Sequence, residues 1–367
     1  MSDSKFILFS DSSKNIGGQE LQALQQMRSL NSAGHQTLLL AKPGSAILAR
    51  AKSEGLATLE VPFRNAFHIP SFLKIWNIVK SKQPDAMICH GSHDALICAL
   101  VGKFAKWFSS QSMPILRVKT FQHGYPLSFA YNYLFSKTIT PSQFLREKFL
   151  VNKSIDSQKI KVLYPGIDFS GLDDGVDVLP PHVQAWLNDH PGSVVSHGAI
   201  LRGEKGHSII LKALVQVKKS FPNVRYLIAG EGQDRPLLEA EILALNLEDN
   251  VLLTGILQKI APLLKVSDVA VLPSLIEPLG MFQIEAQYLE VPTIASNTGG
   301  IPETLLNQKT GLLVKPGDVG QWADAIIWML SNSSVGKEMA REGRHYVQNK
   351  FSLEANTTGL LDLIQNT

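Results

Sequence analysis

Glu277 and Glu285 stand eight positions apart on either side of a glycine, Gly280. A buried-strand pattern precedes them and an apolar-periodic helix follows, so the segment is predicted to be a strand end, a turn and a helix start. Open α/β sheets bind ligands at that edge. Gly280 would let a ligand approach the backbone, and the amides of Met281 and Phe282 would be unpaired donors suited to a phosphate. With a carboxylate on each side, the segment predicts a site for a sugar joined through phosphates to a ribose.

A second strand-to-helix loop, residues 198–206, reads Gly-Ala-Ile-Leu-Arg-Gly-Glu-Lys-Gly. It is superficially like the phosphate loop of ATPases. Glu204 interrupts the required spacing, however, and His207 stands where a hydroxyl would be needed for magnesium. The loop therefore disfavours a P-loop ATPase.

The letters around Glu277, Pro-Ser-x-x-Glu-Pro-x-Gly, make the glutamate pair more specific. Together with residues 290–296, 298–303 and 310–314, they resemble the donor-site signature of the retaining family-four glycosyltransferases, which have the GT-B fold. The resemblance implies transfer of a sugar, with retention, from a nucleotide sugar such as a UDP- or GDP-sugar to an acceptor hydroxyl. General likeness of the first half suggests bacterial lipopolysaccharide, capsule or other glycoconjugate synthesis. The nucleotide sugar is a substrate, and no cofactor is expected.

The same resemblance implies roles for particular residues. Lys205 matches a lysine that neutralises the departing diphosphate, whereas the family's arginine position is filled by Ala199. We therefore expect Arg202 to supply the second positive charge. His123 matches the family's cleft histidine, which contacts the donor sugar or positions the reacting centre. With Glu277, these residues form the expected catalytic set.

The loop after the first strand carries Gly17 and Gly18. It lacks the Gly-x-Gly-x-x-Gly fingerprint of dinucleotide binding. In the resembled family this turn lies near the donor phosphate and the acceptor, and His90 and His93 are further acceptor-side candidates. The expected binding residues are Gly17, Gly18, Gly280, Met281, Phe282 and Glu285.

Metal-binding patterns are absent from the sequence. It contains no Asp-x-Asp, no His-Glu-x-x-His and no cluster of Cys and His. We expect a metal-independent reaction in which Lys205, Arg202 and helix-start amides stabilise the leaving charge. The two cysteines, Cys89 and Cys98, lie in an apolar stretch and are expected to be buried free thiols.

The fold class is indicated by alternating strand and helix patterns in both halves, which predict two facing Rossmann-like, doubly wound parallel-sheet domains. Between them, residues 170–181 are rich in Gly, Asp and Pro and form the linker candidate. The expected division is residues 1–172 as the acceptor-side domain, 173–350 as the nucleotide-sugar domain, and 351–367 packing back on the first domain. Expected strands and helices cover 5–10, 20–33, 36–41, 72–81, 85–90, 94–107 and 116–121, then 194–197, 206–220, 224–229, 235–245, 251–254, 260–266, 269–273, 293–296 and 311–314.

Composition and charge indicate where the protein acts and what kind of partner it could bind. The 367 residues have 44% hydrophobic content, a net charge of +3 and no apolar run long enough to span a bilayer, so we expect a cytoplasmic globular protein. Residues 1–172 carry 20 Lys and Arg against 10 Asp and Glu, and residues 173–367 carry 15 against 22. The basic half suggests an anionic partner, such as a phosphorylated acceptor or the inner face of the plasma membrane contacted peripherally. Solvated lysines with no partner remain the alternative. A nucleic-acid partner is not expected, because no basic run or binding module accompanies the charge.

Three other functions stay open. A nucleotide-sugar epimerase and a sugar phosphorylase use the same fold, and a non-catalytic protein could bind a nucleotide sugar. The binding protein is disfavoured because it would not need the complete set of Glu277, Glu285 and Lys205. The expected partners are thus a nucleotide-sugar donor and a glycan or lipid-linked acceptor.

Overall fold

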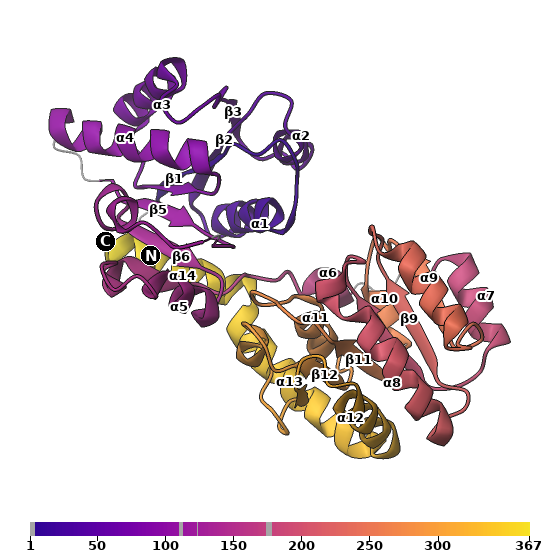
Figure 1. The fold of residues 1–367 in the computed structure, drawn as a ribbon. Coiled ribbons are helices and arrows are strands. Elements are labelled where there is room, and N and C mark those ends of the chain that lie inside the picture. Colours follow the sequence, from indigo (N-terminus) through magenta and orange to yellow (C-terminus); the bar gives the residue numbers. More distant parts are fainter. Residues whose placement is uncertain (1–3, 110–112, 123, 174–177) are drawn as a thin grey trace. The chain divides into compact units, whose positions relative to one another are not determined.

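The computed structural model describes residues 4–109, 113–122, 124–173 and 178–367 (Figure 1). The chain splits into two compact units: Met1–Ile167 with Phe351–Thr367, and Asp168–Lys350. Each unit contains one parallel sheet with helices on both faces, so the predicted pair of doubly wound domains is confirmed. The units divide between residues 167 and 168, five residues before the expected boundary.

The sheet of the first unit has seven parallel strands in the order β3-β2-β1-β4-β5-β6-β7. They are β1 (Phe6–Asp11), β2 (Gln36–Ala41), β3 (Thr58–Glu60), β4 (Ala86–Cys89), β5 (Ile115–Val118), β6 (Lys137–Thr140) and β7 (Ile160–Val162). One face packs on α1 (Gly18–Ser32), α2 (Ala46–Ser53) and the C-terminal α14 (Leu353–Gln365). The other packs on α3 (Ile69–Lys82), α4 (Ser92–Ser109) and the short π-helix η1 (Ala130–Leu134). The unit also contains α5 (Gln143–Leu150) and the single 3-10 turn η2 (Ser157–Lys159).

The sheet of the second unit has six parallel strands in the order β10-β9-β8-β11-β12-β13. They are β8 (Val194–Gly198), β9 (Arg225–Ala229), β10 (Val251–Gly255), β11 (Val269–Leu272), β12 (Thr293–Ser296) and β13 (Leu312–Val314). The helices are α6 (Ser170–Asp173), α7 (Pro181–Asp189), α8 (His207–Ser220), α9 (Arg235–Ala244), α10 (Ala261–Lys265), α11 (Phe282–Tyr288), α12 (Val319–Ser331) and α13 (Ser333–Phe351), with 3-10 turns η3 (Gly203–Lys205) and η4 (Ile301–Glu303). Every residue of β11 is buried, as expected for a strand covered on both faces.

Helix α14 belongs to the first unit although it ends the chain. It packs on α1, where the Gln26 side chain donates to the Asn356 Oδ1 at 2.9 Å. The Ser29 and Thr357 hydroxyls lie 2.6 Å apart. The Ile167 amide donates to the Phe351 carbonyl at 2.7 Å, which holds the start of the C-terminal segment beside the end of the first unit.

Both sheets reverse their strand order at one place. In the first unit the order turns between β1 and β4, and in the second between β8 and β11. The loops that leave such neighbouring strands diverge to opposite faces and open a crevice at the carboxyl edge. Each unit therefore has one crevice at which its topology favours ligand binding.

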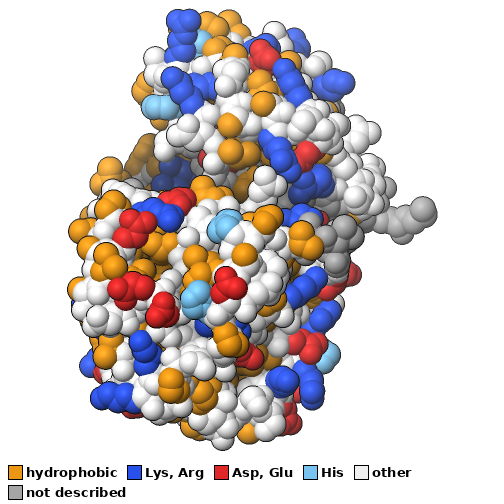
Figure 2. Space-filling view, turned by 90° about the vertical axis from the view of Figure 1, so that its right-hand side faces the viewer, with side chains coloured by type: hydrophobic (Ala, Val, Ile, Leu, Met, Phe, Trp, Pro, Cys, Tyr) orange, Lys and Arg blue, Asp and Glu red, His pale blue; other side chains and the backbone are white. Residues whose placement is uncertain are grey.

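Acidic, basic and hydrophobic side chains are interspersed on the face drawn in Figure 2. Among the described residues, no helix is both long enough and apolar enough to cross a membrane.

Candidate active site

The loops after β8 and β11 meet at the strand-order reversal of the second sheet. Gly206 has φ +76°, and a Cβ there would lie 2.1 Å from the Pro273 carbonyl oxygen. The Leu275 amide donates to the Glu204 carbonyl at 2.8 Å. Only a glycine lets the two backbones approach so closely. The fold thus brings together two loops whose charged residues, Lys205 and Glu277, lie 72 positions apart in the sequence.

Lys205 and Glu277 form an ion pair across these loops, with the Lys205 Nζ 2.6 Å from the Glu277 Oε2. Their side chains are only 16% and 12% exposed. The Glu277 carbonyl accepts the Gly300 amide at 3.0 Å, and a Cβ on Gly299 (φ +58°) would lie 1.9 Å from that oxygen. The backbone of Glu277 is therefore fixed against a glycine pair, and the ammonium group is held at the carboxyl edge.

Helix α11 starts directly after this loop. Gly280 has φ +84°, which suits glycine, and Met281 is the residue before the first helical turn. The buried Gln283 donates from Nε2 to the Leu279 carbonyl at 2.9 Å and to the Thr304 hydroxyl at 3.0 Å. These bonds tie the start of α11 to the turn after η4. The amides of Met281 and Phe282 thus belong to a rigid helix start.

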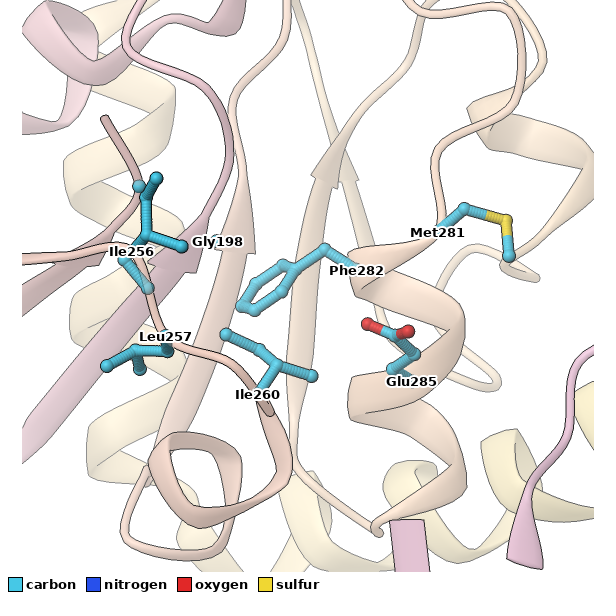
Figure 3. Close-up of a pocket in the computed structure, with 9 residues that line it drawn as sticks. Gly198, Ile256, Leu257, Ile260, Met281, Phe282 and Glu285 are labelled. Carbon is cyan, nitrogen blue, oxygen red and sulfur yellow. The ribbon is translucent and has the colours of Figure 1, made fainter. Parts of the chain in front are cut away.

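Glu285 lines a cavity of about 280 Å³ beside this helix (Figure 3). The Phe282 ring points from α11 towards Ile260 in the loop after β10, and Met281 at the start of α11 also lines the cavity. The other lining residues, Gly198, Ala229, Gly230, Ile256, Leu257 and Ile260, make a largely apolar wall. Burial raises the pKa of Glu285 to about 7. A polar group that binds there as a donor would favour the ionised carboxylate.

Arg202 lies apart from the ion pair. Its guanidinium pairs with Glu204 at 2.8 Å, and its side chain is 47% exposed. It lines a separate hollow of about 200 Å³ with Asp234 and Glu241. The structure therefore brings Lys205 and Glu277 together but leaves Arg202 in another environment, and its role at the diphosphate stays a prediction.

Two buried histidines lie beneath the loop after β8, and the sequence analysis did not single them out. The rings of His197 and His207 stack with centroids 4.4 Å apart. The His197 Nδ1 lies 3.0 Å from the Tyr226 hydroxyl. Burial and then the Lys205 charge lower the pKa of His207 to about 4, and burial lowers that of His197 well below its usual value. Both rings are neutral, so they add no charge to the site.

Gly17 and Gly18 lie at the carboxyl edge of the first sheet. Gly17 precedes α1, its amide bonds the Glu20 carboxylate at 2.8 Å, and a Cβ on Gly18 would meet nothing within 4 Å. Gln19 connects this loop to its surroundings by donating to the His90 carbonyl at 3.2 Å and accepting from the Thr120 hydroxyl at 3.0 Å. The glycine loop is thus exposed above an ordered polar base.

That base contains two buried carboxyls that the sequence analysis missed, Asp11 and Asp94. Asp94 accepts from the Ser10 hydroxyl at 2.8 Å, and Asp11 accepts from the Ser13 amide at 2.6 Å. Burial and then the neighbouring Asp94 raise the pKa of Asp11 to about 7, and burial raises that of Asp94. Burial also lowers the pKa of His90 to about 4. Each of these pKa shifts favours the uncharged form of its side chain, so burial reduces the charge of all three titratable groups.

His123 lies outside the described residues, and His93 is exposed at the start of α4. Cys89 and Cys98 are buried free thiols, as predicted. Among the residues that the structure describes, no group of three or more His, Cys, Asp or Glu could hold a metal ion.

The fold and the site define a class of protein: it has two doubly wound units, one of which carries a partly buried Lys–Glu pair and a carboxylate-lined cavity at its strand-order reversal. Residues 16–170 match the profile described as Glycosyltransferase Family 4, and residues 186–346 match that of Glycosyl transferases group 1. The two ranges cover most of the chain. The chain therefore belongs to the GT-B glycosyltransferases of the family-four type, and the predicted resemblance is confirmed.

Curated relatives match parts of the chain. The D-inositol 3-phosphate glycosyltransferase of Segniliparus rotundus is 31% identical over 56% of this chain and 46% of its own. The capsular polysaccharide biosynthesis glycosyltransferase CapM of Staphylococcus aureus is 30% identical over 58% of this chain and 57% of its own. The chain thus spans about half the length of these relatives.

Solved structures match nearly its whole length. A glycosyltransferase from Rickettsia africae has a TM-score of 0.86 at 22% identity, covering 99% of this chain and 98% of the other. Anabaena HepE in complex with UDP has a TM-score of 0.82 at 19% identity, covering 98% and 100%. At these identities the likeness shows the fold.

Proposed function

We propose that this protein transfers a glycosyl group from a nucleotide-sugar donor to an acceptor hydroxyl, with retention of the anomeric configuration and without a metal. The observation that carries the proposal is the Lys205–Glu277 ion pair at the strand-order reversal, next to the cavity lined by Glu285. Its parts match what a nucleotide sugar needs: a cation for the diphosphate, a carboxylate for hydroxyls and an apolar wall for a base.

The donor is proposed to lie with its ribose at Glu285. In that position the ribose hydroxyls donate to the Glu285 carboxylate, and the base contacts the apolar side chains of Ile256, Leu257 and Ile260; none of the described residues that line the cavity is a cation. The diphosphate then lies towards the start of α11 and Lys205. A positive charge held there stabilises the leaving diphosphate, which is more negative in the transition state than in the donor.

Retention enters the proposal through the resemblance of the Glu277 to Glu285 segment to the retaining family. The acceptor is proposed to be a bacterial glycan or lipid-linked molecule, because the curated relatives include CapM, named for capsular polysaccharide biosynthesis. His123 is kept as the proposed residue near the reacting centre.

A panel of UDP- and GDP-sugars, screened by thermal shift, tests the donor. A ligand at about a hundred times its dissociation constant should stabilise the fold by about 2.7 kcal/mol. The selected donor is then incubated with the protein, and released nucleoside diphosphate is measured with and without candidate acceptors. NMR of the product gives the configuration at the anomeric carbon.

Three results would contradict parts of the proposal. An inverted product would remove retention. Interconversion of free nucleotide sugars without acceptor would identify an epimerase, and binding with no slow donor hydrolysis and no transfer would favour the non-catalytic alternative.

A further inference from the structure

Exposed aromatic side chains are concentrated in one stretch of the first unit. Among the described residues, eight Phe, Tyr and Trp side chains are exposed, and seven of them lie between Phe67 and Tyr133. The eighth is Trp328 in α12. Single exposed apolar residues need no explanation, but a gathering of large ones marks an interaction surface. This stretch therefore differs from the rest of the described surface.

The clearest part of it lies on two neighbouring helices, α3 and α4 (Figure 1), and on the loop that leads into α3. We call it the α3–α4 patch, and it consists of Phe67 in that loop, Ile69 and Leu73 on α3, and Trp107 and Phe108 on α4. Trp107 is 81% exposed and Phe67 76%.

A packed layer of rings supports the patch. The Phe104 ring centroid lies 5.6 Å from that of Phe72, 4.9 Å from that of Trp76 and 4.2 Å from that of Phe108. The Trp107 and Phe108 rings are 5.2 Å apart. Because the inner rings belong to both helices, the outer side chains of α3 and α4 are held on an ordered base.

The charge around the patch has one sign. Residues 61–146 contain ten Lys and Arg but only two acidic residues, Asp85 and Asp94. Asp94 is fully buried, so Asp85 is the one acidic side chain that this range exposes. Exposed cations stand on the same elements as the patch: Arg64, Lys74, Lys103 and Lys106.

We propose that the α3–α4 patch docks on an anionic lipid surface. Aromatic rings favour the boundary between lipid headgroups and acyl chains, while lysine side chains extend from such a surface towards anionic headgroups. A second copy of the chain would place like charges opposite one another. A nucleic acid would leave the central apolar side chains uncovered. A membrane satisfies both the apolar and the basic parts.

This inference rests on the proposed function only in one respect, that a lipid-linked acceptor would lie in the same membrane. Docking itself needs no donor, so vesicle binding and donor binding can fail separately. The Glu285→Gln variant tests this: it should weaken donor binding and leave vesicle binding unchanged.

Co-sedimentation with vesicles of phosphatidylcholine containing a third phosphatidylglycerol, and with phosphatidylcholine alone, measures the docking. The full chain should partition to the anionic vesicles and lose most of this binding in high salt. Each lysine near such a surface contributes about fivefold, so Lys103→Glu with Lys106→Glu should lower partitioning by at least about 25-fold. Trp107→Ser with Phe108→Ser should lower it by about tenfold or more.

Matched variants on the second unit serve as controls: Lys219→Glu with Lys337→Glu for charge, and Leu243→Ser for exposed apolar surface. These should bind as the unaltered protein does. Thermal unfolding checks that each variant is folded. Trp107 fluorescence, taken as the difference from Trp107→Phe, should shift to the blue with anionic vesicles.

Equal binding to both kinds of vesicle, or patch variants that bind as well as their controls, would overturn the proposal. A protein that ignores vesicles but changes from dimer to monomer in the Trp107→Ser and Phe108→Ser variant would show that the patch is a contact between copies instead.

Discussion

The two sheets reverse their strand order in the same way, yet the groups at the two reversals differ. In the second unit the Lys205–Glu277 pair and Glu285 lie at an accessible edge, beside a cavity. In the first unit Asp11 and Asp94 are fully buried below an exposed glycine loop. One edge carries accessible charge that could meet a ligand, while the other uses titratable groups to hold a loop. The same topology therefore supports a charged candidate site in one place and a scaffold in the other.

The largest effect is expected at the accessible edge. Lys205→Ala should lower turnover by about 100- to 1,000-fold, because it removes the cation that stabilises the leaving diphosphate. Arg202→Ala is the matched variant. Its turnover should fall by less than about fivefold, because Arg202 is half exposed and already pairs with Glu204. Turnover measured at saturating donor separates the two. A loss at Arg202 as large as that at Lys205 would mean that the Arg202 side chain rearranges to meet the diphosphate.

Much of this edge could be predicted from the sequence. Gly280, the start of α11 and the strand before it follow from turn chemistry and apolar periodicity, and their type and position agree with the structure. The pairing of Lys205 with Glu277 could not be derived in the same way, because it depends on which strands are neighbours. The apolar wall at Ile256 and Leu257 was missed because it belongs to a loop with no polar signal.

Less of the first unit could be predicted from the sequence. The short strands β3, β6 and β7 were not predicted, since three or four residues give too little periodicity. Helix α2, with eight residues, is only about two turns long and was not predicted either. Asp11 and Asp94 were missed because an aspartate at a strand end or in the first turn of a helix is normally solvated. Only the backbone packing shows that both carboxyls are buried.

The pH dependence of the free energy of unfolding also distinguishes the two sheet edges. Burial raises the pKa of Glu285 from 4.5 to about 7, so the folded state keeps a proton that the unfolded chain releases. The favourable contribution is complete below pH 4.5 and is lost as the pH rises through 7. At pH 8 Glu285→Gln should therefore stabilise the unliganded protein by up to about 3 kcal/mol. Denaturant unfolding at pH 8 and at pH 4.5 measures this, and a variant that is less stable at pH 8 would contradict it.

The buried carboxyl of Asp11, in the first unit, should affect stability in the same direction, but its substitution should not weaken donor binding. The pKa of Asp11 is raised to about 7, so the contribution of this carboxyl to stability also disappears between pH 4 and pH 7. Asp11→Asn should stabilise the protein at pH 8 by up to about 4 kcal/mol relative to its effect at pH 4. Calorimetric donor binding should change less than twofold. A large loss of donor affinity would show that the first edge takes part in donor binding, and the contrast between the two edges would fail.

Donor affinity should depend on pH through Glu285. In the proposed donor pose the ribose hydroxyls donate to the ionised carboxylate, so donor binding should require loss of the proton that the free protein holds below about pH 7. Affinity should fall as the pH drops below 7, approaching tenfold per pH unit, and be constant above it. In Glu285→Gln the affinity should be about tenfold lower at pH 8 and no longer vary with pH. Titration calorimetry from pH 5.5 to 8.5 shows both, and a wild-type profile that is flat across this range would place the ribose elsewhere.

The smallest effect is expected from removing metals. If Lys205 and the amides at the start of α11 stabilise the leaving charge, excess EDTA should change turnover by less than about twofold. The sensitive form of this test uses Lys205→Ala, because a hidden divalent ion would become more important once the ammonium group is gone. Added magnesium or manganese should not restore that variant. Restoration by manganese, or loss of wild-type activity in EDTA, would mean that a metal shares the accessible edge with the ion pair.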